Sequence, residues 1–215
     1  MRRFERFLNL FGASAIERWI TLALMALALA ARLIPGPRMI DDAFITFRYA
    51  RNLVQSAGFI YNTGERVLGT TTPVYTLLMA AWSLVTGSQA FPLFALITNA
   101  LADTLNTYLV YHLGRRLSHR PLVGWAAASL WAISSPSVTF AIGGMETSVF
   151  ILLMLGAFTA HIEQRLRASA VLAALALLTR PDAALIAVLI AGQLALENFK
   201  FQLSNSKSPK QAYVR

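Results

Sequence analysis

The sequence contains no cysteine and little charge. Without cysteine the chain has no disulfide, no cysteine-ligated zinc and no cysteine nucleophile, although this absence does not fix its compartment. Charged residues make up 13% of the chain, whereas an ordinary soluble domain carries about 25%. The sequence also lacks a Walker loop, a dinucleotide-binding fingerprint and a metalloprotease helix. The absence of cysteine excludes thiol-dependent enzymes, and no motif indicates a nucleotide-binding enzyme or a metalloprotease.

Hydrophobic residues are abundant instead, at 56% of 215 residues, and the mean hydropathy is +0.55. They occur in long blocks, which carry more apolar surface than one core of this size can bury. We therefore expect an all-α, polytopic transmembrane bundle of about six membrane helices. The apolar blocks cover about 19–35, 91–113, 122–140, 147–162 and 168–196.

Two of these blocks need a closer description. The last is interrupted by Arg180-Pro181-Asp182, which predicts two short helices meeting at a turn. The first follows a basic lead containing Arg2, Arg3, Arg6 and Arg18. A signal peptide is an alternative there, because Ala28-Leu29-Ala30 resembles a small-residue cleavage site. An uncleaved first span is favoured, since the lead is long and further apolar blocks follow.

The net charge of +9 is distributed between the apolar blocks and does not form one patch, so we expect no nucleic-acid partner. Cytoplasmic loops are enriched in Lys and Arg. If the modest apolar stretch 71–87 stays at the interface without crossing, every basic cluster falls on the cytoplasmic side. The clusters are the N-terminus, Arg115-Arg116-His119-Arg120, Arg165 with Arg167, and the tail with Lys200, Lys207 and Lys210. The acids expected outside are Asp41, Asp42, Glu65, Glu146 and Asp182.

This topology divides the chain into a transmembrane domain at 1–197, with an outer loop at about 36–90, and a polar basic tail at 198–215 that we expect to be disordered. In the loop, Asp41-Asp42 precedes a predicted interfacial helix from Ala43 to Ala57. Its apolar face, expected toward the membrane, holds Ala43, Phe47, Ala50 and Val54, and its polar face holds Arg48, Arg51, Asn52 and Gln55. Gly58 is expected to end it in a left-handed cap, and Asn62-Thr63-Gly64 predicts a turn.

Two adjacent carboxylates at a membrane surface suit catalysis. One can accept a proton from an attacking hydroxyl while its neighbour binds a cation or orients the base. Arg48 or Arg51 could hold a phosphate as a planar donor fork. The alternative is that Asp41 or Asp42 only caps the following helix. Both interpretations stay open, since capping needs only one of the two acids.

Three further polar features interrupt the apolar sequence. Asn99, Asp103 and Asn106 form a stripe at i, i+4 and i+7, which indicates interhelical hydrogen bonds or, alternatively, a polar cavity. Glu146 precedes an apolar block, where a helix N-terminus favours an acid in any case. Arg180 suits an anionic headgroup, and an ion pair with Asp182 is the alternative.

These motifs resemble the GT-C glycosyltransferases. The segment DDAFITFRYARNL at 41–53, followed by Gly58 and YNTGERV at 61–67, resembles their first outer loop. Gly144-Met145-Glu146-Thr147 and Leu178-Thr179-Arg180-Pro181-Asp182 resemble two later motifs in the same order. The likeness runs from about residue 19 to 197 and is strongest for the bacterial mannosyltransferase and arabinofuranosyltransferase-like branch, whose members are typically longer, so the chain is expected to be an N-terminal portion.

The resemblance implies an enzyme that transfers a sugar from a polyprenyl-phosphate donor to a hydroxyl of a glycan, lipid or protein. It implies a bacterial-type inner (plasma) membrane, with the N-terminus cytoplasmic and the first loop extracytoplasmic. Asp41 would be the general base and Asp42 its partner or the ligand of a divalent cation, Mg²⁺ or Mn²⁺. Arg180 would contact the carrier phosphate, with Asp182 beside it, and Glu146 would line the cavity. The other hypotheses are a transporter or lipid flippase and a non-catalytic, truncated membrane subunit.

Overall fold

The computed structural model of the protein describes residues 14–65, 67 and 69–206, and this part of the chain is helical without strands. The predicted all-α fold is confirmed. The basic lead with Arg2, Arg3 and Arg6, and the tail from residue 207 with Lys207 and Lys210, lie outside the described residues. The elements are α2 (Ala15–Leu33), α3 (Asp41–Val54), α4 (Pro73–Thr86), α5 (Phe91–Ser118), α6 (Pro121–Ala132), α7 (Ser135–Ile142), α8 (Thr147–Ile162), α9 (Leu166–Leu177), the 3-10 turn η1 (Pro181–Ala183) and α10 (Ala184–Ser206).

Local sequence signals explain several helix ends. Ser14 and Glu17 form a capping box at the start of α2. Proline occupies a first-turn position, where its missing N–H costs no helical bond, in α4, α5, α6, α7 and η1. Ser56 and Gly58 adopt positive φ angles of 61° and 97° after α3. The left-handed position thus comes two residues earlier than the predicted cap at Gly58.

The structure corrects two predicted boundaries and confirms a third. The block at 122–140 is two helices, because α6 ends at Ala132 and α7 restarts at Ser135. The interruption at 180–182 is present as predicted. Residues 198–206 continue α10 as a helix, so the prediction of a disordered tail from residue 198 is wrong for this stretch.

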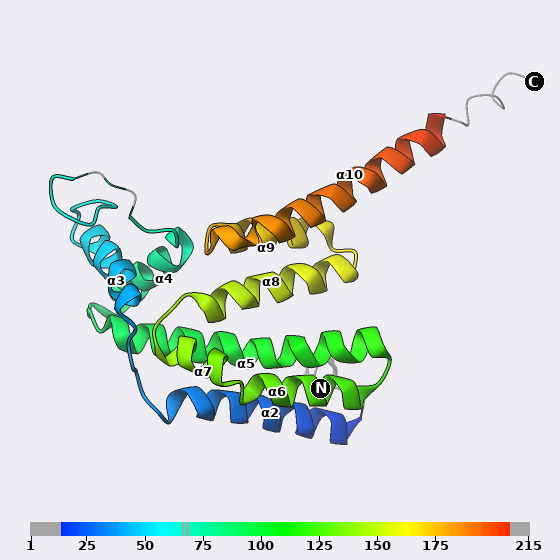
Figure 1. The fold of residues 1–215 in the computed structure, drawn as a ribbon, viewed down its shortest axis with the longest axis horizontal. Coiled ribbons are helices and arrows are strands. Elements are labelled where there is room, and N and C mark those ends of the chain that lie inside the picture. Colours follow the sequence, from blue (N-terminus) through cyan, green and yellow to red (C-terminus); the bar gives the residue numbers. More distant parts are fainter. Residues whose placement is uncertain (1–13, 66, 68, 207–215) are drawn as a thin grey trace, which may run out of the picture.

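The helices form an elongated bundle (Figure 1). The central helix α5 packs against α2, α6 and α8, and α9 packs against α8 and α10. The helices α3 and α4 lie together at one end, at the left in Figure 1, beside the α7–α8 turn and the α9–α10 turn. We call this the acid end, because it carries the five acids predicted to share one side. The basic clusters around Arg115 and Arg165 lie at the opposite end, called the basic end.

The stretch 71–87 stays at the acid end. The Val74 N–H at its start donates to the Leu178 carbonyl, 3.2 Å away. Near its end, the Trp82 Nε1–H donates to Thr98 Oγ1 over 2.9 Å, and the ring stacks on Phe94. Since α4 packs on the first turns of α5, it does not run the length of the bundle.

The apolar face of α3 is covered by protein. Ala43, Phe47 and Ala50 are buried in a cluster with residues of α4 and α5, and the Phe47 and Phe91 rings stack with centroids 5.8 Å apart. The expectation that this face rests on the membrane is therefore wrong: it packs onto α4 and the start of α5.

A buried ion pair joins α2 to α5. The Arg32 Nε–H donates to Asp103 Oδ2 over 3.0 Å, and both side chains are fully buried. Arg32 also donates to the Ser137 hydroxyl and to the main-chain carbonyls of Ala28, Trp131 and Ala132. Ser137 and Asn106 complete the bonding of the Asp103 carboxylate, each over 3.0 Å.

The same stripe makes further contacts between helices. Asn99 donates to the carbonyls of Ala141 and Met145, and Asn106 donates to that of Ser148. The predicted interhelical hydrogen bonds are thus present along the whole stripe, whose three residues are all fully buried.

Among the described residues, α5 is the one helix long and apolar enough to cross a membrane by itself, and half of its most apolar stretch is buried. Helices in the cores of soluble proteins can meet the same two criteria. The other apolar helices found there are shorter, at Pro73–Thr86, Pro121–Ala132, Thr147–Ile162, Leu166–Leu177 and Pro181–Gln193.

Candidate functional site

The site begins where the segment before α3 crosses the α7–α8 turn. Arg38 N–H donates to the Ile142 carbonyl over 2.8 Å, and Ile40 N–H donates to the Gly143 carbonyl over 2.9 Å. A Cβ at Gly143 would lie 2.6 Å from Ile40 Cδ1, and one at Gly144 would lie 2.6 Å from Met39 Sδ. The pair of glycines therefore permits the close approach that brings the start of α3 beside Glu146.

A cavity of about 250 Å³ opens at this crossing, and we call it the acid cavity. Asp42 enters its wall from α3, and Glu146 enters from the start of α8. Hydroxyl groups form another part of the wall, since Thr72 Oγ1 lies 3.2 Å from Thr46 Oγ1 and 3.1 Å from Thr70 Oγ1. The remaining described lining residues are Ile45, Gly69, Thr71 and Met145.

Asp41 and Asp42 begin α3, and they do not cap it. The N-cap position belongs to Ile40, which makes no side-chain cap bond. Neither carboxylate forms a hydrogen bond or ion pair within the described part of the chain, and both residues are exposed. Asp42 lines the acid cavity, whereas Asp41 is not among the described residues of its wall. The capping interpretation is therefore wrong for this structure, and Asp42 is the acid with a cavity beside it.

Glu146 is the N-cap residue of α8 and is 7% exposed. Burial raises the pKa of its carboxyl above the ordinary value, because the charged form loses hydration. The nearby charges of Asp42 and Asp182 also raise the pKa, whereas a main-chain hydrogen bond and Arg180 lower it. A carboxyl in this setting holds its proton to a higher pH than an exposed glutamate does.

Arg180 bridges the two acids nearest to it. Its Nη1–H donates to Glu146 Oε1 over 3.4 Å, and its Nε–H and Nη2–H donate to Asp182 Oδ2 over 3.2 and 2.8 Å. The ion pair predicted as the alternative for Arg180 is thus present. A guanidinium has five N–H donors, so these three bonds leave two N–H groups for another anion. Its side chain is 34% exposed.

Arg48 and Arg51 are not gathered with the acids. The Arg48 Nε–H donates to the Tyr61 carbonyl and its Nη2–H to Asn62 Oδ1, each over 2.9 Å, and its guanidinium lies 4.4 Å from the centre of the Tyr61 ring. Arg51 is exposed and shares a different cavity, of about 430 Å³, with Arg48. The other described residues of that cavity are Asn52, Gln55 and Gln89.

The donor set does not fit the metal role predicted for Asp42. No group of three His, Cys, Asp or Glu side chains in the described part of the chain is placed to hold an ion. Asp42 and Glu146 are the two acids lining the cavity, and Glu146 is already bound to Arg180. We therefore derive no step through a metal.

The sequence interpretation missed several contributors to the site. The hydroxyls of Thr70 and Thr72 line the cavity, although the polar run Thr70-Thr71-Thr72 before Pro73 was a visible signal. Gly69 approaches the cavity through its main chain, and nothing in its sequence neighbourhood predicts this.

Comparisons of the chain with protein-family models, with curated proteins and with solved structures gave no match.

Proposed function

We propose that the chain is an integral membrane glycosyltransferase that transfers a sugar from a polyprenyl-phosphate donor to a hydroxyl acceptor outside the cytoplasm. One observation carries the proposal: Asp42 and Glu146, which come from elements distant in sequence, line one cavity, and Arg180 pairs with Glu146 over 3.4 Å. The resemblance of 41–53, 144–147 and 178–182 to GT-C motifs supports the same chemistry, because those segments supply these three residues.

A polytopic membrane bundle is the first part of the proposal, and the distribution of apolar side chains supports it. Alanines such as Ala128, Ala157 and Ala176 are buried between helices, whereas large side chains such as Leu130 and Leu189 are 71% and 68% exposed. Small residues inside and large apolar residues outside are typical of helices that pack in lipid. A soluble protein rarely exposes so much apolar surface.

The two ends of the bundle support an orientation. The basic end holds a cavity of about 610 Å³ lined by basic side chains, of which Arg116 and His119 are exposed. Cytoplasmic loops favour Arg and Lys, so we place the basic end in the cytoplasm and the acid end outside. With α6 and α7 counted as one crossing, α2, α5, α6–α7, α8, α9 and α10 give the six membrane helices.

Reporter fusions test this topology. Alkaline phosphatase joined after residue 88 should be active outside the cytoplasm, and fusions after residues 120 and 164 should be inactive. Activity at 120 would mean that α4 crosses the membrane. Release of the full chain from membranes by alkaline carbonate would contradict the membrane proposal itself.

The chemistry assigned to the acid end is an inverting sugar transfer. The Asp42 carboxylate accepts the proton of the acceptor hydroxyl as its oxygen attacks the anomeric carbon. The bond between that carbon and the phosphate oxygen breaks, and the polyprenyl phosphate leaves with the electron pair. The two free N–H groups of Arg180 stabilise the leaving phosphate. Asp41, which was expected to be the base, is a neighbour of Asp42 in this assignment.

The test is sugar transfer in membranes that contain the full chain and a radiolabelled pool of polyprenyl-phosphate sugars. Removing a general base costs about 10²–10⁴ in rate, so Asp42→Asn should lose at least about a hundredfold. Glu163→Gln, which removes an acid at the basic end, is the matched control and should keep activity. Equal transfer by wild type and Asp42→Asn would remove Asp42 as the base. Loss only in Asp41→Asn would restore the original assignment.

The transporter hypothesis loses its main support. It depended on Asn99, Asp103 and Asn106 facing a polar pathway, but their side chains bond to neighbouring helices and are fully buried. The helix break at Arg180 lies at the acid end and not in the middle of the bundle.

A further inference from the structure

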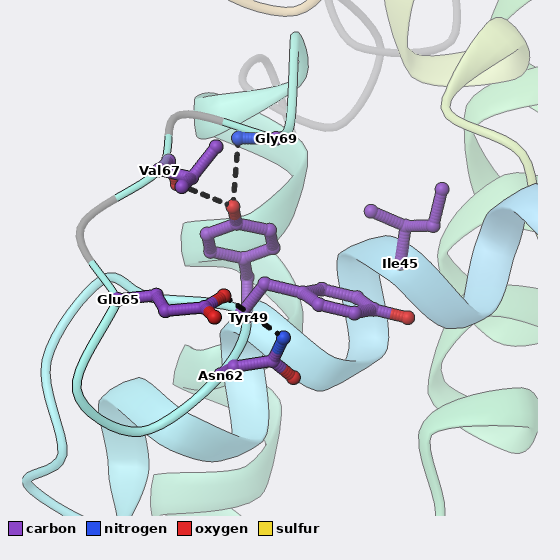
Figure 2. A pocket seen from close by; sticks show the side chains of 7 residues that line it. Ile45, Tyr49, Asn62, Glu65, Val67 and Gly69 are labelled. Carbon is purple, nitrogen blue, oxygen red and sulfur yellow. Dashed lines mark hydrogen bonds between the residues drawn. The ribbon is translucent and has the colours of Figure 1, made fainter.

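A second pocket adjoins the acid cavity, and we call it the loop pocket. Its volume is about 270 Å³. Ile45 and Tyr49 of α3 form one wall, and the described residues of the other wall are Tyr61, Asn62, Glu65, Val67 and Gly69 (Figure 2). The loop pocket and the acid cavity share Ile45 and Gly69. A ligand in the loop pocket therefore lies next to the cavity that Asp42 lines.

Three side chains of α3 hold the loop in place. The Tyr49 hydroxyl donates to the Val67 carbonyl and accepts from the Gly69 N–H, each over 2.7 Å (Figure 2). Asn52 Nδ2 donates to the carbonyls of Ile60 and Tyr61 over 2.8 and 3.0 Å. Arg48 holds Tyr61 and Asn62, as described above. The pocket is therefore preformed, which lowers the entropic cost of binding.

The walls combine an apolar surface with a polar rim. Ile45, Val67 and the Tyr61 ring supply the apolar part, whereas the Asn62 amide and the Glu65 carboxylate supply the polar part. Asn62 Nδ2 donates to Glu65 Oε2 over 3.1 Å, which fixes both groups and leaves Glu65 Oε1 able to accept a hydroxyl donor. None of the seven described lining residues is a cation.

These features select a neutral, hydroxyl-bearing ligand. A phosphate would face the Glu65 carboxylate, and the Arg48 guanidinium is already bonded to Tyr61 and Asn62. A hydrocarbon chain would remove water from the Glu65 carboxylate without offering a hydrogen bond in return, which is costly. A sugar ring fits, because its C–H face packs on apolar and aromatic groups while its hydroxyls bond to amide and carboxylate.

We infer that the loop pocket binds a neutral sugar unit of the acceptor and presents its hydroxyl to the acid cavity. The acceptor is then a glycan or glycolipid. The role of the bound sugar as acceptor rests on the proposed function. Sugar binding in the loop pocket can be tested without any transfer.

The test is saturation-transfer NMR on the full chain in lipid nanodiscs. The probes are the methyl glycosides of mannose, glucose and arabinose, with glycerol phosphate and hexanol as anionic and apolar competitors. At least one glycoside should bind. Val67→Trp places a bulky side chain in the pocket from a residue that is 59% exposed, and it should weaken binding at least tenfold. Glu65→Gln should weaken it several-fold, whereas the control Arg116→Gln at the basic end should leave it unchanged.

Three results would overturn the inference: no glycoside binds, Val67→Trp binds like wild type, or glycerol phosphate or hexanol displaces the sugar. The transfer assay separates this inference from the proposed function. Suppose that wild type binds a glycoside but transfers no sugar, and that Val67→Trp does not bind it. The sugar site would then stand, and the proposed enzyme activity would be rejected. Transfer that proceeds equally in wild type and Val67→Trp would keep the enzyme and reject the sugar site.

Discussion

Two regions of the molecule give a carboxylate different surroundings. One region holds Asp103, and the other holds Asp42 and Glu146. Asp103 is buried where α2, α5 and α7 meet, a region that we call the shaft. Both of its oxygens accept hydrogen bonds, from Arg32, Ser137 and Asn106. At the acid end, Asp42 faces a cavity without a hydrogen bond from a described residue, and Glu146 shares Arg180 with Asp182.

The difference teaches where chemistry can occur in this chain. A carboxylate whose lone pairs are filled by fixed neighbours has no capacity to take a proton from a ligand, and its role is to hold helices together. A carboxylate that lines a cavity keeps that capacity. The shaft should therefore respond to substitution in stability, and the acid end should respond in binding and rate.

Removing one partner of the shaft pair should have the largest effect. Asp103→Ala leaves the Arg32 guanidinium buried without its counter-charge, and breaking a buried pair in this way costs about 3–5 kcal/mol. We expect a loss of that size in the free energy of unfolding, measured in detergent micelles. A loss below about 1 kcal/mol would place the pair among exposed ion pairs, whose contribution is that small, and would contradict the burial described above.

A double substitution sharpens the same test. Arg32→Met with Asp103→Leu removes both charges, and apolar replacement of a buried pair is often neutral. The double variant should recover most of the stability that Asp103→Ala loses. If it is as unstable as the single variant, the hydrogen bonds from Arg32 to the Ala28 and Trp131 carbonyls, and not the charges, hold the shaft.

Adding a methyl group at the α7–α8 turn should have an intermediate effect at the acid end. Gly144 has a φ of +78°, and a Cβ there would lie 2.6 Å from Met39 Sδ. A left-handed non-glycine residue costs roughly 1–2 kcal/mol, so Gly144→Ala should lose about that much stability. It should also weaken glycoside binding, because the start of α3 is displaced.

Gly192→Ala is the matched control for Gly144→Ala. A Cβ at Gly192 meets nothing within 4 Å, and alanine favours a helix interior over glycine by about 1 kcal/mol. This variant should be as stable as wild type or more stable. A comparable loss in both variants would mean that the glycine pair is not what holds the first loop against α8.

The smallest effect concerns pH. The pKa of Glu146 is raised above its ordinary value of 4.5 mainly by burial. At a pH between the ordinary pKa of the unfolded chain and the raised pKa of the folded protein, the folded state binds more protons than the unfolded state. Stability therefore falls as pH rises through that window. The stability of wild type relative to Glu146→Gln should decrease from about pH 4.5 upward. An increase instead would mean that the ion pair with Arg180 outweighs burial.

Much of the helical layout could be predicted from local sequence signals. Apolar blocks, first-turn prolines and the Arg180-Pro181-Asp182 interruption mark most helices, and charge placed the stretch 71–87 at the same end as Asp41. The break between α6 and α7 was missed, although Ser134-Ser135-Pro136 marks it. Contacts over long separations had no local signal: Asp103 was noticed, but its partner Arg32, 71 residues away, was not.

The site was predictable in its residues more than in its arrangement. Asp42 and Glu146 line one cavity, and Arg180 pairs with Glu146 and Asp182. Successive helix residues point about 100° apart, so whether Asp41 or Asp42 lines the cavity depends on how α3 packs against α4. That packing is a tertiary property, and so is the use of Arg48 to hold the loop at Tyr61.

Arg32 also has a consequence for the order in which the chain is assembled. Its ionic partner follows 71 residues later and the Ala132 carbonyl 100 residues later, so at about 5–20 residues per second of synthesis roughly 5–20 s pass before all its partners exist. An arginine without partners is costly at membrane depth. Under the membrane topology proposed above, α2 would therefore stay beside the insertion machinery until α5 and α6 emerge. The first helix made would be among the last released into lipid.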